Sequence, residues 1–121
     1  MKEKGISLDV QIEMIDLNFI DPIDVTTIFG NLLDNAIEAA EQVDGVKNIF
    51  IKLGSYHKMI VVRIENSCSI VKWRNGLPVS EKGKDRGIGL LNVKNSIEKY
   101  DGDLKLKQDK DKFIVELFLN S

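Results

Sequence analysis

Two asparagines one helical turn apart are the residues in this sequence best suited to chemistry. Asn31 and Asn35 lie in the segment Asn31-Leu-Leu-Asp-Asn35-Ala-Ile-Glu38, whose apolar residues recur at helical spacing. Asparagine is a mediocre helix former that is favoured at caps, so two of them inside a helix indicate that their side chains are used. Amide oxygens are hard ligands suited to Mg²⁺ and its water shell, and amide N–H groups donate to phosphate.

Both asparagines belong to a narrow polar stripe on the predicted helix. At about 100° per residue, the polar side chains that share this side are Asp24, Thr27, Asn31, Asp34, Asn35, Glu38 and Gln42. The stripe contains no lysine or arginine. An amphipathic helix with a solvated face explains the same pattern, and in that interpretation Glu38 is simply the solvated end of the stripe. The residues alone leave a ligand-binding stripe and a solvated face as alternatives.

A basic loop that carries glycines precedes the last predicted helix. The text Lys82-Gly-Lys84-Asp-Arg86-Gly87-Ile88-Gly89-Leu90 runs into a helical pattern that extends to residue 100. Backbone N–H groups at a helix N-terminus form an anion site, and glycines let a phosphate approach closely. A lone Gly-X-Gly is more often an ordinary turn before a helix. The spacing fits neither a P-loop nor a dinucleotide-binding fingerprint.

The elements that must position these residues alternate between extended and helical patterns. Period-2 alternation predicts a half-buried strand over 5–15, and Asp24 is expected to cap a helix that runs to residue 43. Further predictions are strands over 48–53 and 59–65, a helix over 87–100 and a hairpin of 103–107 with 113–119. Segment 66–86 has little periodicity, and a loop of that length is usually a lid or a binding loop.

This order predicts a two-layer α/β sandwich, with a mixed sheet of about five strands and helices on one face. The other face must be polar or covered by a partner. A length of 121 residues fits one domain, and a net charge of −2 argues against nucleic acid or an anionic membrane as the main partner. The single cysteine, Cys68, cannot form an internal disulfide, and no apolar run is long enough to span a bilayer. We therefore expect an intracellular domain without direct membrane contact.

In their order along the chain, these pieces resemble the GHKL superfamily of histidine kinases, gyrase B, MutL and large heat-shock chaperones. The Asn31–Glu38 segment looks like the kinase N box, and Arg86-Gly87-Ile88-Gly89-Leu90 looks like the G2 box. The resemblance covers nearly the whole chain, so residues 1–121 are expected to form a single ATP-binding domain (a fragment of a longer kinase) with its lid at about 67–86. The variety that it resembles most is the Agr-type kinase that senses peptide pheromones.

The resemblance implies ATP and Mg²⁺ as ligands and assigns roles to particular residues. Asn35 would be the metal ligand, with Asn31 near the phosphates. The triphosphate would be cradled by Gly87 and Gly89, with the backbone around Ile88 and Leu90, and assisted by the lid cations Lys82, Lys84 and Arg86. The strand end Ile64-Glu-Asn66 departs from the family pattern: Asn66 stands where an adenine-reading aspartate is usual, and two glycines are missing. An asparagine carbonyl can still accept from the adenine amino group.

The resemblance further implies the ATP-binding catalytic domain of a two-component sensor histidine kinase, the cytoplasmic part of a membrane-bound sensor. It would position Mg·ATP for phosphoryl transfer to a histidine on a separate dimerisation domain, with a response regulator downstream. Hydrolases of the superfamily carry a glutamate where Asn31 stands, and asparagine cannot be that base. The only histidine, His57, lies in a hairpin turn, so we expect no phosphoacceptor or other catalytic residue in this chain. The alternatives are a serine-phosphorylating anti-sigma factor and a degenerate nucleotide-binding or docking module.

Overall fold

The computed structural model describes residues 5–13, 15–68, 72–74, 77–79 and 86–120. Its elements follow the predicted order of strand, helix, hairpin, lid segment, helix and hairpin. They are β1 (Ile6–Ile12), α1 (Pro22–Glu41), β2 (Lys47–Tyr56), β3 (Met59–Ser67), β4 (Lys72–Arg74), β5 (Leu77–Val79), α2 (Arg86–Glu98), β6 (Asp103–Asp109) and β7 (Lys112–Asn120).

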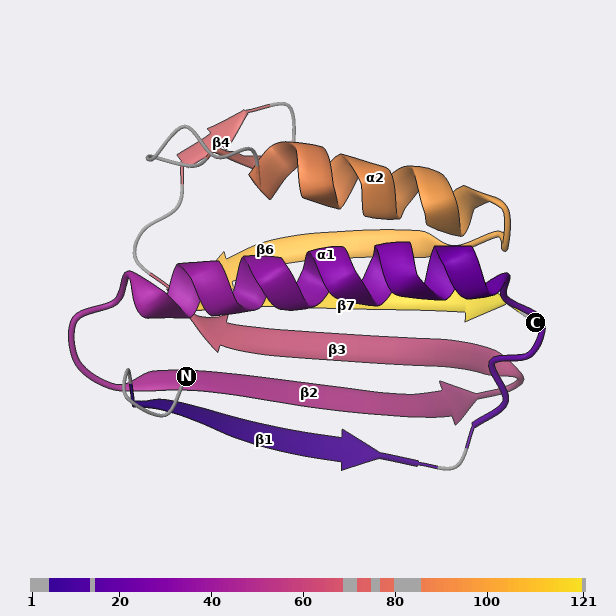
Figure 1. Ribbon diagram of the computed structural model, residues 1–121, viewed down its shortest axis with the longest axis horizontal. Coiled ribbons are helices and arrows are strands. Elements are labelled where there is room, and N and C mark those ends of the chain that lie inside the picture. Colours follow the sequence, from indigo (N-terminus) through magenta and orange to yellow (C-terminus); the bar gives the residue numbers. More distant parts are fainter. Residues whose placement is uncertain (1–4, 14, 69–71, 75–76, 80–85, 121) are drawn as a thin grey trace.

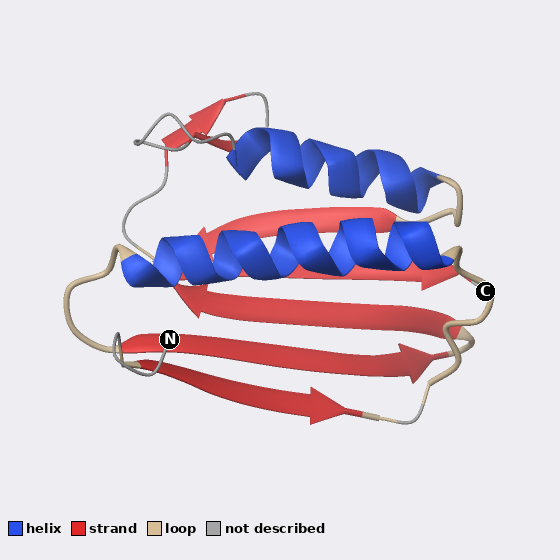
Figure 2. Cartoon of the chain, viewed as in Figure 1, coloured by secondary structure: helices blue, strands red, loops and turns tan. Residues whose placement is uncertain are grey.

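Five of the strands form one mixed sheet in the order β1-β2-β3-β7-β6. β1 pairs with β2 in parallel, and the other neighbours are antiparallel. Both helices lie on one face of this sheet (Figures 1 and 2), so the predicted two-layer α/β sandwich is confirmed. Within the segment predicted as an irregular lid, β4 and β5 pair as a separate two-stranded sheet. Periodicity could not reveal these strands because each has only three residues.

The core lies between the two helices and the sheet. β3 alternates between half-buried and fully buried positions, so every second side chain faces the helices. The largest fully buried side chains come from all the central elements, namely Ile28, Leu32, Val62, Ile64, Leu90, Val93, Ile97, Leu117 and Leu119. These residues fix the distance and the orientation of α1 and α2 above the sheet.

The start of α1 differs from the prediction. The N-cap is Asp21, whose side chain accepts a hydrogen bond from the Ile23 backbone N–H at 2.9 Å, and Pro22 occupies the first helical turn. Proline suits that position because its fixed φ is helical and its missing N–H would have no partner there. The prediction that Asp24 caps the helix was therefore wrong. Asp24 is buried, with 5% of its surface exposed.

The prediction of a half-buried β1 was also wrong. The register pairs Leu8 with the buried Ile49, so the apolar side chains of β1 do point to the helix side of the sheet. Nevertheless Leu8 is 63% exposed and Ile12 is 66% exposed. β1 is an edge strand, and α1 packs over β2 and β3. β1 therefore lies outside the area of the sheet that the helices cover.

Candidate nucleotide-binding site

The polar stripe of α1 begins beside the residues that follow α2. At its beginning, Asp24 accepts hydrogen bonds from Tyr100 Oη and from Lys99 Nζ, the latter at 3.2 Å to Oδ1. The hydrogen bond from Tyr100, with the nearby Lys99, holds the pKa of Asp24 below its usual value although the carboxylate is buried. Asn31 lies two helical turns further along the same side of α1.

The two helices are antiparallel, because the first turn of α1 contacts residues that directly follow α2. Figure 1 shows that the end of α1, the end of β3 and the beginning of α2 lie at the same end of the domain. Asn66 is near the end of β3 and Gly87 is in the first turn of α2, while Asn35 lies in the second half of α1. These residues come from three separate motifs of the sequence.

The beginning of α2 carries the glycines. The helix starts at Arg86, so Gly87 and Gly89 belong to its first turn, whose backbone N–H groups have no partner within the helix. Such groups bind anions. Leu90 is 1% exposed and its side chain belongs to the core, so only its backbone is available to a ligand. The side chains of Arg86 and Ile88, and both lid lysines Lys82 and Lys84, lie outside the part of the chain whose positions are described.

The two asparagines of α1 differ in their hydrogen bonding. Asn31 Nδ2 donates to the backbone oxygen of Thr27 at 2.7 Å, within its own helix. Asn35 Nδ2 is buried and has no hydrogen-bond partner among the described residues. A buried donor without a partner costs about 1–3 kcal/mol. Its environment therefore favours an acceptor supplied by a ligand. Nδ2 can donate to a phosphate oxygen, whereas the Oδ1 atom of the same amide is the one that could bind Mg²⁺.

Glu38 does not fit the alternative in which it is simply the solvated end of the stripe. Its Oε1 atom is buried and has no hydrogen-bond partner among the described residues. Asp34, by contrast, is exposed. Helical spacing places these side chains on one side of α1 but does not report what packs above each of them, so the sequence held no signal that separates Glu38 from Asp34.

Asn66 occupies the end of β3. It follows Ile64 on the helix side of the strand and is 3% exposed, and its Nδ2 atom donates to the backbone oxygen of Ser67 at 3.0 Å. The hollow that it borders has a volume of about 40 Å³, which is too small for a purine. The described residues at this strand end therefore do not by themselves form a cavity that could hold a purine.

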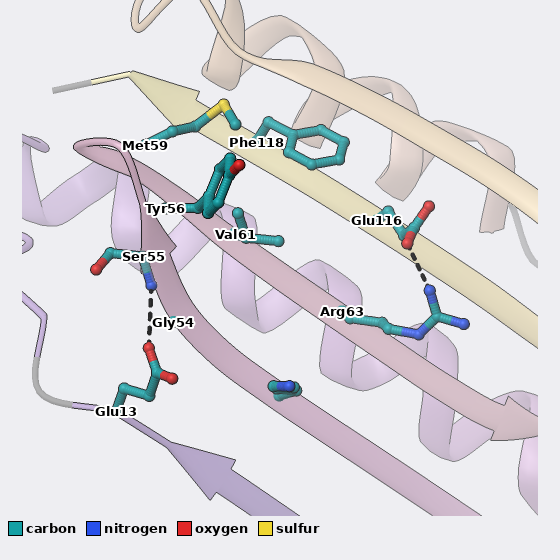
Figure 3. Close-up of a pocket in the computed structure, with 10 residues that line it drawn as sticks. Glu13, Gly54, Ser55, Tyr56, Met59, Val61, Arg63, Glu116 and Phe118 are labelled. Atoms are coloured by element: carbon teal, nitrogen blue, oxygen red, sulfur yellow. Dashed lines mark hydrogen bonds and ion pairs between the residues drawn. The ribbon is translucent and has the colours of Figure 1, made fainter.

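A larger hollow of about 550 Å³ lies on the open face of the sheet, away from the helices (Figure 3). Gly54 lines it, and the Glu13 carboxylate lies over Gly54, where an added Cβ would come within 2.7 Å of Glu13 Oε1. The same carboxylate accepts a hydrogen bond from Ser55 N at 3.4 Å. Arg63 lies nearby and is ion-paired with Glu65 and Glu116, which confirms that this uncovered face is partly polar. None of the predicted site residues whose positions are fully described lines this hollow. The candidate site is therefore on the helix side of the sheet, where Asn35 and Asn66 lie.

Other possible sites are not supported. His57 is exposed in the β2–β3 turn with φ 50°, as predicted, and is not on a helix. Among the described residues, no three histidine, cysteine, aspartate or glutamate side chains gather as a metal cluster. Neither described helix combines the length and the apolar composition that crossing a membrane requires.

Comparisons with known proteins agree with this geometry. A family model described as GHKL domain matches residues 20–120. The sensor protein CitS of Bacillus subtilis (strain 168) is 37% identical over 90 residues, which are 69% of this chain and 16% of CitS. This chain therefore spans only a small part of that relative.

Solved structures of histidine kinases share the fold. The catalytic domain of histidine kinase ThkA superposes with a TM-score of 0.76 at 18% identity, covering 98% of this chain and 81% of the other. Full-length ShkA in complex with AMPPNP gives a TM-score of 0.64 at 15% identity, covering 99% of this chain and 27% of ShkA. The family match spans most of the sequence, and the fold is that of a histidine kinase catalytic domain. The chain therefore belongs to the GHKL domain family.

Proposed function

We propose that this chain is the ATP-binding catalytic domain of a two-component sensor histidine kinase, with residues 1–121 forming one domain and a lid at about 67–86. It would hold Mg·ATP for phosphoryl transfer to a histidine on a separate dimerisation domain, and a response regulator would act downstream. The single observation that carries this proposal is Asn35 Nδ2 in the N-box-like segment, which is buried and has no hydrogen-bond partner among the described residues. The family match and the AMPPNP that ShkA binds support it.

In this proposal the residues of the chain bind and orient the nucleotide. The backbone N–H groups around Gly87 and Gly89, with Ile88 and Leu90, would hold the phosphates at the first turn of α2, and Lys82, Lys84 and Arg86 would neutralise their charge. Asn35 would bind Mg²⁺, which neutralises charge on the transferred phosphoryl group. Asn66 would read the adenine edge. Phosphoryl transfer depends mainly on positioning and charge neutralisation, so this set needs no catalytic base of its own.

Asn31 favours a kinase over a hydrolase. Its Nδ2 already donates a hydrogen bond to the Thr27 carbonyl, and an amide cannot take a proton from water. Transfer to another domain is then the remaining fate of the phosphoryl group. Within the histidine kinases, the Glu65-Asn66 strand end and the Asp-Asn-Ala-Ile-Glu text support an Agr-type kinase, part of a membrane-bound sensor. CitS is itself a sensor protein.

A calorimetric titration with ATP in the presence of Mg²⁺ tests the proposal. We expect micromolar to millimolar affinity in the parent chain and almost none in Asn35→Ala, with both proteins folded. Asn95→Ala is the matched control, because Asn95 is exposed on α2 and its removal should leave the ATP affinity unchanged. Absence of adenine nucleotide binding by the parent at millimolar ATP would refute the kinase and favour a docking module. Unchanged binding by Asn35→Ala would refute this site.

A further inference from the structure

Two complementary polar atoms on α1 are buried and do not bond to each other. Asn35 Nδ2 is a donor and Glu38 Oε1 is an acceptor, and neither has a hydrogen-bond partner among the described residues. The two residues are three positions apart, which makes their side chains neighbours on the helix surface. Their carbon chains are long enough for a direct hydrogen bond, yet each atom remains available to a third group.

The chemistry of that third group follows from the two atoms. It must accept a hydrogen bond from Asn35 and must offer Glu38 either a donor or positive charge. The ion pairs of the described residues lie elsewhere, joining Arg63 to two glutamates and Lys99 to Asp24. A phosphate oxygen accepts from an amide, and water bound to a divalent cation donates to a carboxylate. A cation–phosphate pair therefore satisfies both atoms together.

We propose that Glu38 holds the hydration shell of the divalent cation that accompanies the nucleotide. This inference rests on the function proposed above and assigns Glu38 as a second residue, besides Asn35, on which metal binding depends. Mg²⁺ in phosphate-binding sites commonly keeps several waters and is held by one or two carboxylates together with the phosphates.

The carboxylate has a second consequence. Without a cation, its negative charge repels the polyphosphate, and the repulsion is strengthened because Glu38 Oε1 is shielded from water. Glu38 should therefore strengthen binding of Mg·ATP and weaken binding of metal-free ATP. This opposite pair of effects makes the site selective for the metal-bound nucleotide.

The test compares ATP binding in Mg²⁺ and in EDTA for the parent and for Glu38→Gln, which keeps the shape and removes the charge. With Mg²⁺, we expect affinity to fall at least about tenfold, equivalent to about 1.4 kcal/mol. With EDTA, we expect the variant to bind ATP more tightly than the parent. Asp34→Asn is the matched control, because it removes the same charge from an exposed position on the same helix and should change neither affinity.

Each other outcome overturns the inference. A loss by the same factor in Mg²⁺ and in EDTA would mean that Glu38 pairs with a cationic side chain, and unchanged affinities would mean that it has no role in binding. Glu38→Asp, which retains the charge, should keep the preference for metal-bound ATP even if Glu38→Gln melts at a lower temperature. If the parent binds no adenine nucleotide, the proposed function fails together with this inference. If the parent binds ATP and Glu38→Gln has the same ATP affinities in Mg²⁺ and in EDTA as the parent, only the inference is refuted.

Discussion

Replacing Asn66 by aspartate should destabilise the fold, although aspartate is the usual residue of related kinases at this strand end. Asn66 is 3% exposed and donates from Nδ2 to the Ser67 carbonyl at 3.0 Å. In Asn66→Asp, a carboxylate oxygen replaces the donor and faces that carbonyl oxygen. Loss of a buried hydrogen bond with both groups left unpaired costs about 1–3 kcal/mol.

The size of the chain allows this cost to be expressed as a decrease in melting temperature. At about 2.1 cal/mol/K per residue, a chain of 121 residues has an unfolding entropy of about 0.25 kcal/mol/K. The expected decrease is therefore about 4–12 °C, measured by circular dichroism or calorimetry. Asn48→Asp is the matched control, since Asn48 is exposed on the neighbouring strand β2 and should shift the melting temperature by no more than about 2 °C.

The nucleotide provides an independent measurement on the same residue. If Asn66 reads adenine, Asn66→Ala should weaken ATP binding by about 5- to 150-fold, whereas Asn66→Asp retains the acceptor and should bind ATP largely as the parent does. The parent should also prefer ATP to GTP. An Asn66→Asp protein that melts with the parent would refute the role given to the Ser67 hydrogen bond. An Asn66→Ala protein with unchanged ATP affinity and ATP/GTP preference would refute adenine recognition by this residue.

Three further predictions concern stability. Gly102→Ala should destabilise the protein by about 1–3 kcal/mol in urea unfolding, because the added Cβ would lie 2.6 Å from the Phe118 carbonyl oxygen and 2.9 Å from Ile97 Cβ. Gly30→Ala should stabilise it by about 0.5–1 kcal/mol, because nothing lies within 4 Å of the added Cβ and alanine is the better residue inside α1. Asp24 has a folded-state pKa below its ordinary 3.8. Its ionised carboxylate therefore stabilises the fold above pH 3.8, and this stabilisation is lost as the pH falls through the lower pKa of the folded state. Asp24→Asn should therefore flatten the loss of stability as the pH falls below 3.8 in urea titrations.

The sequence was sufficient to predict the order of the elements except for the short strands β4 and β5, and it identified one motif in α1 and another at the start of α2. Helical spacing identified α1 and placed Asn31 and Asn35 on one side of it, and alternation identified β1, β2 and β3. These periodicities report which side chains share a side of an element. They do not report whether another layer covers that side, which is why Leu8 was expected to be buried and is 63% exposed.

Contacts between distant segments could not be predicted in the same way. Asp24 has the residue type of an N-cap and lies near a helix start, but its partners, Lys99 and Tyr100, are 75 and 76 positions away. Glu38 looked solvated because its neighbours in sequence are compatible with a polar face. Only the packing of the folded chain shows that its Oε1 atom is shielded from water.

The most direct test of the central claim is to locate ATP on the folded chain by NMR. Titration with Mg·ATP should shift the side-chain amide of Asn35 and the backbone amides of Gly87 and Gly89, where α1 and α2 meet. The amides of Gly54 and Ser55, beside the larger hollow on the open face, should not move. Shifts centred on Gly54 and Ser55, with Asn35 and Gly87 unaffected, would contradict a nucleotide site on the helix side of the sheet.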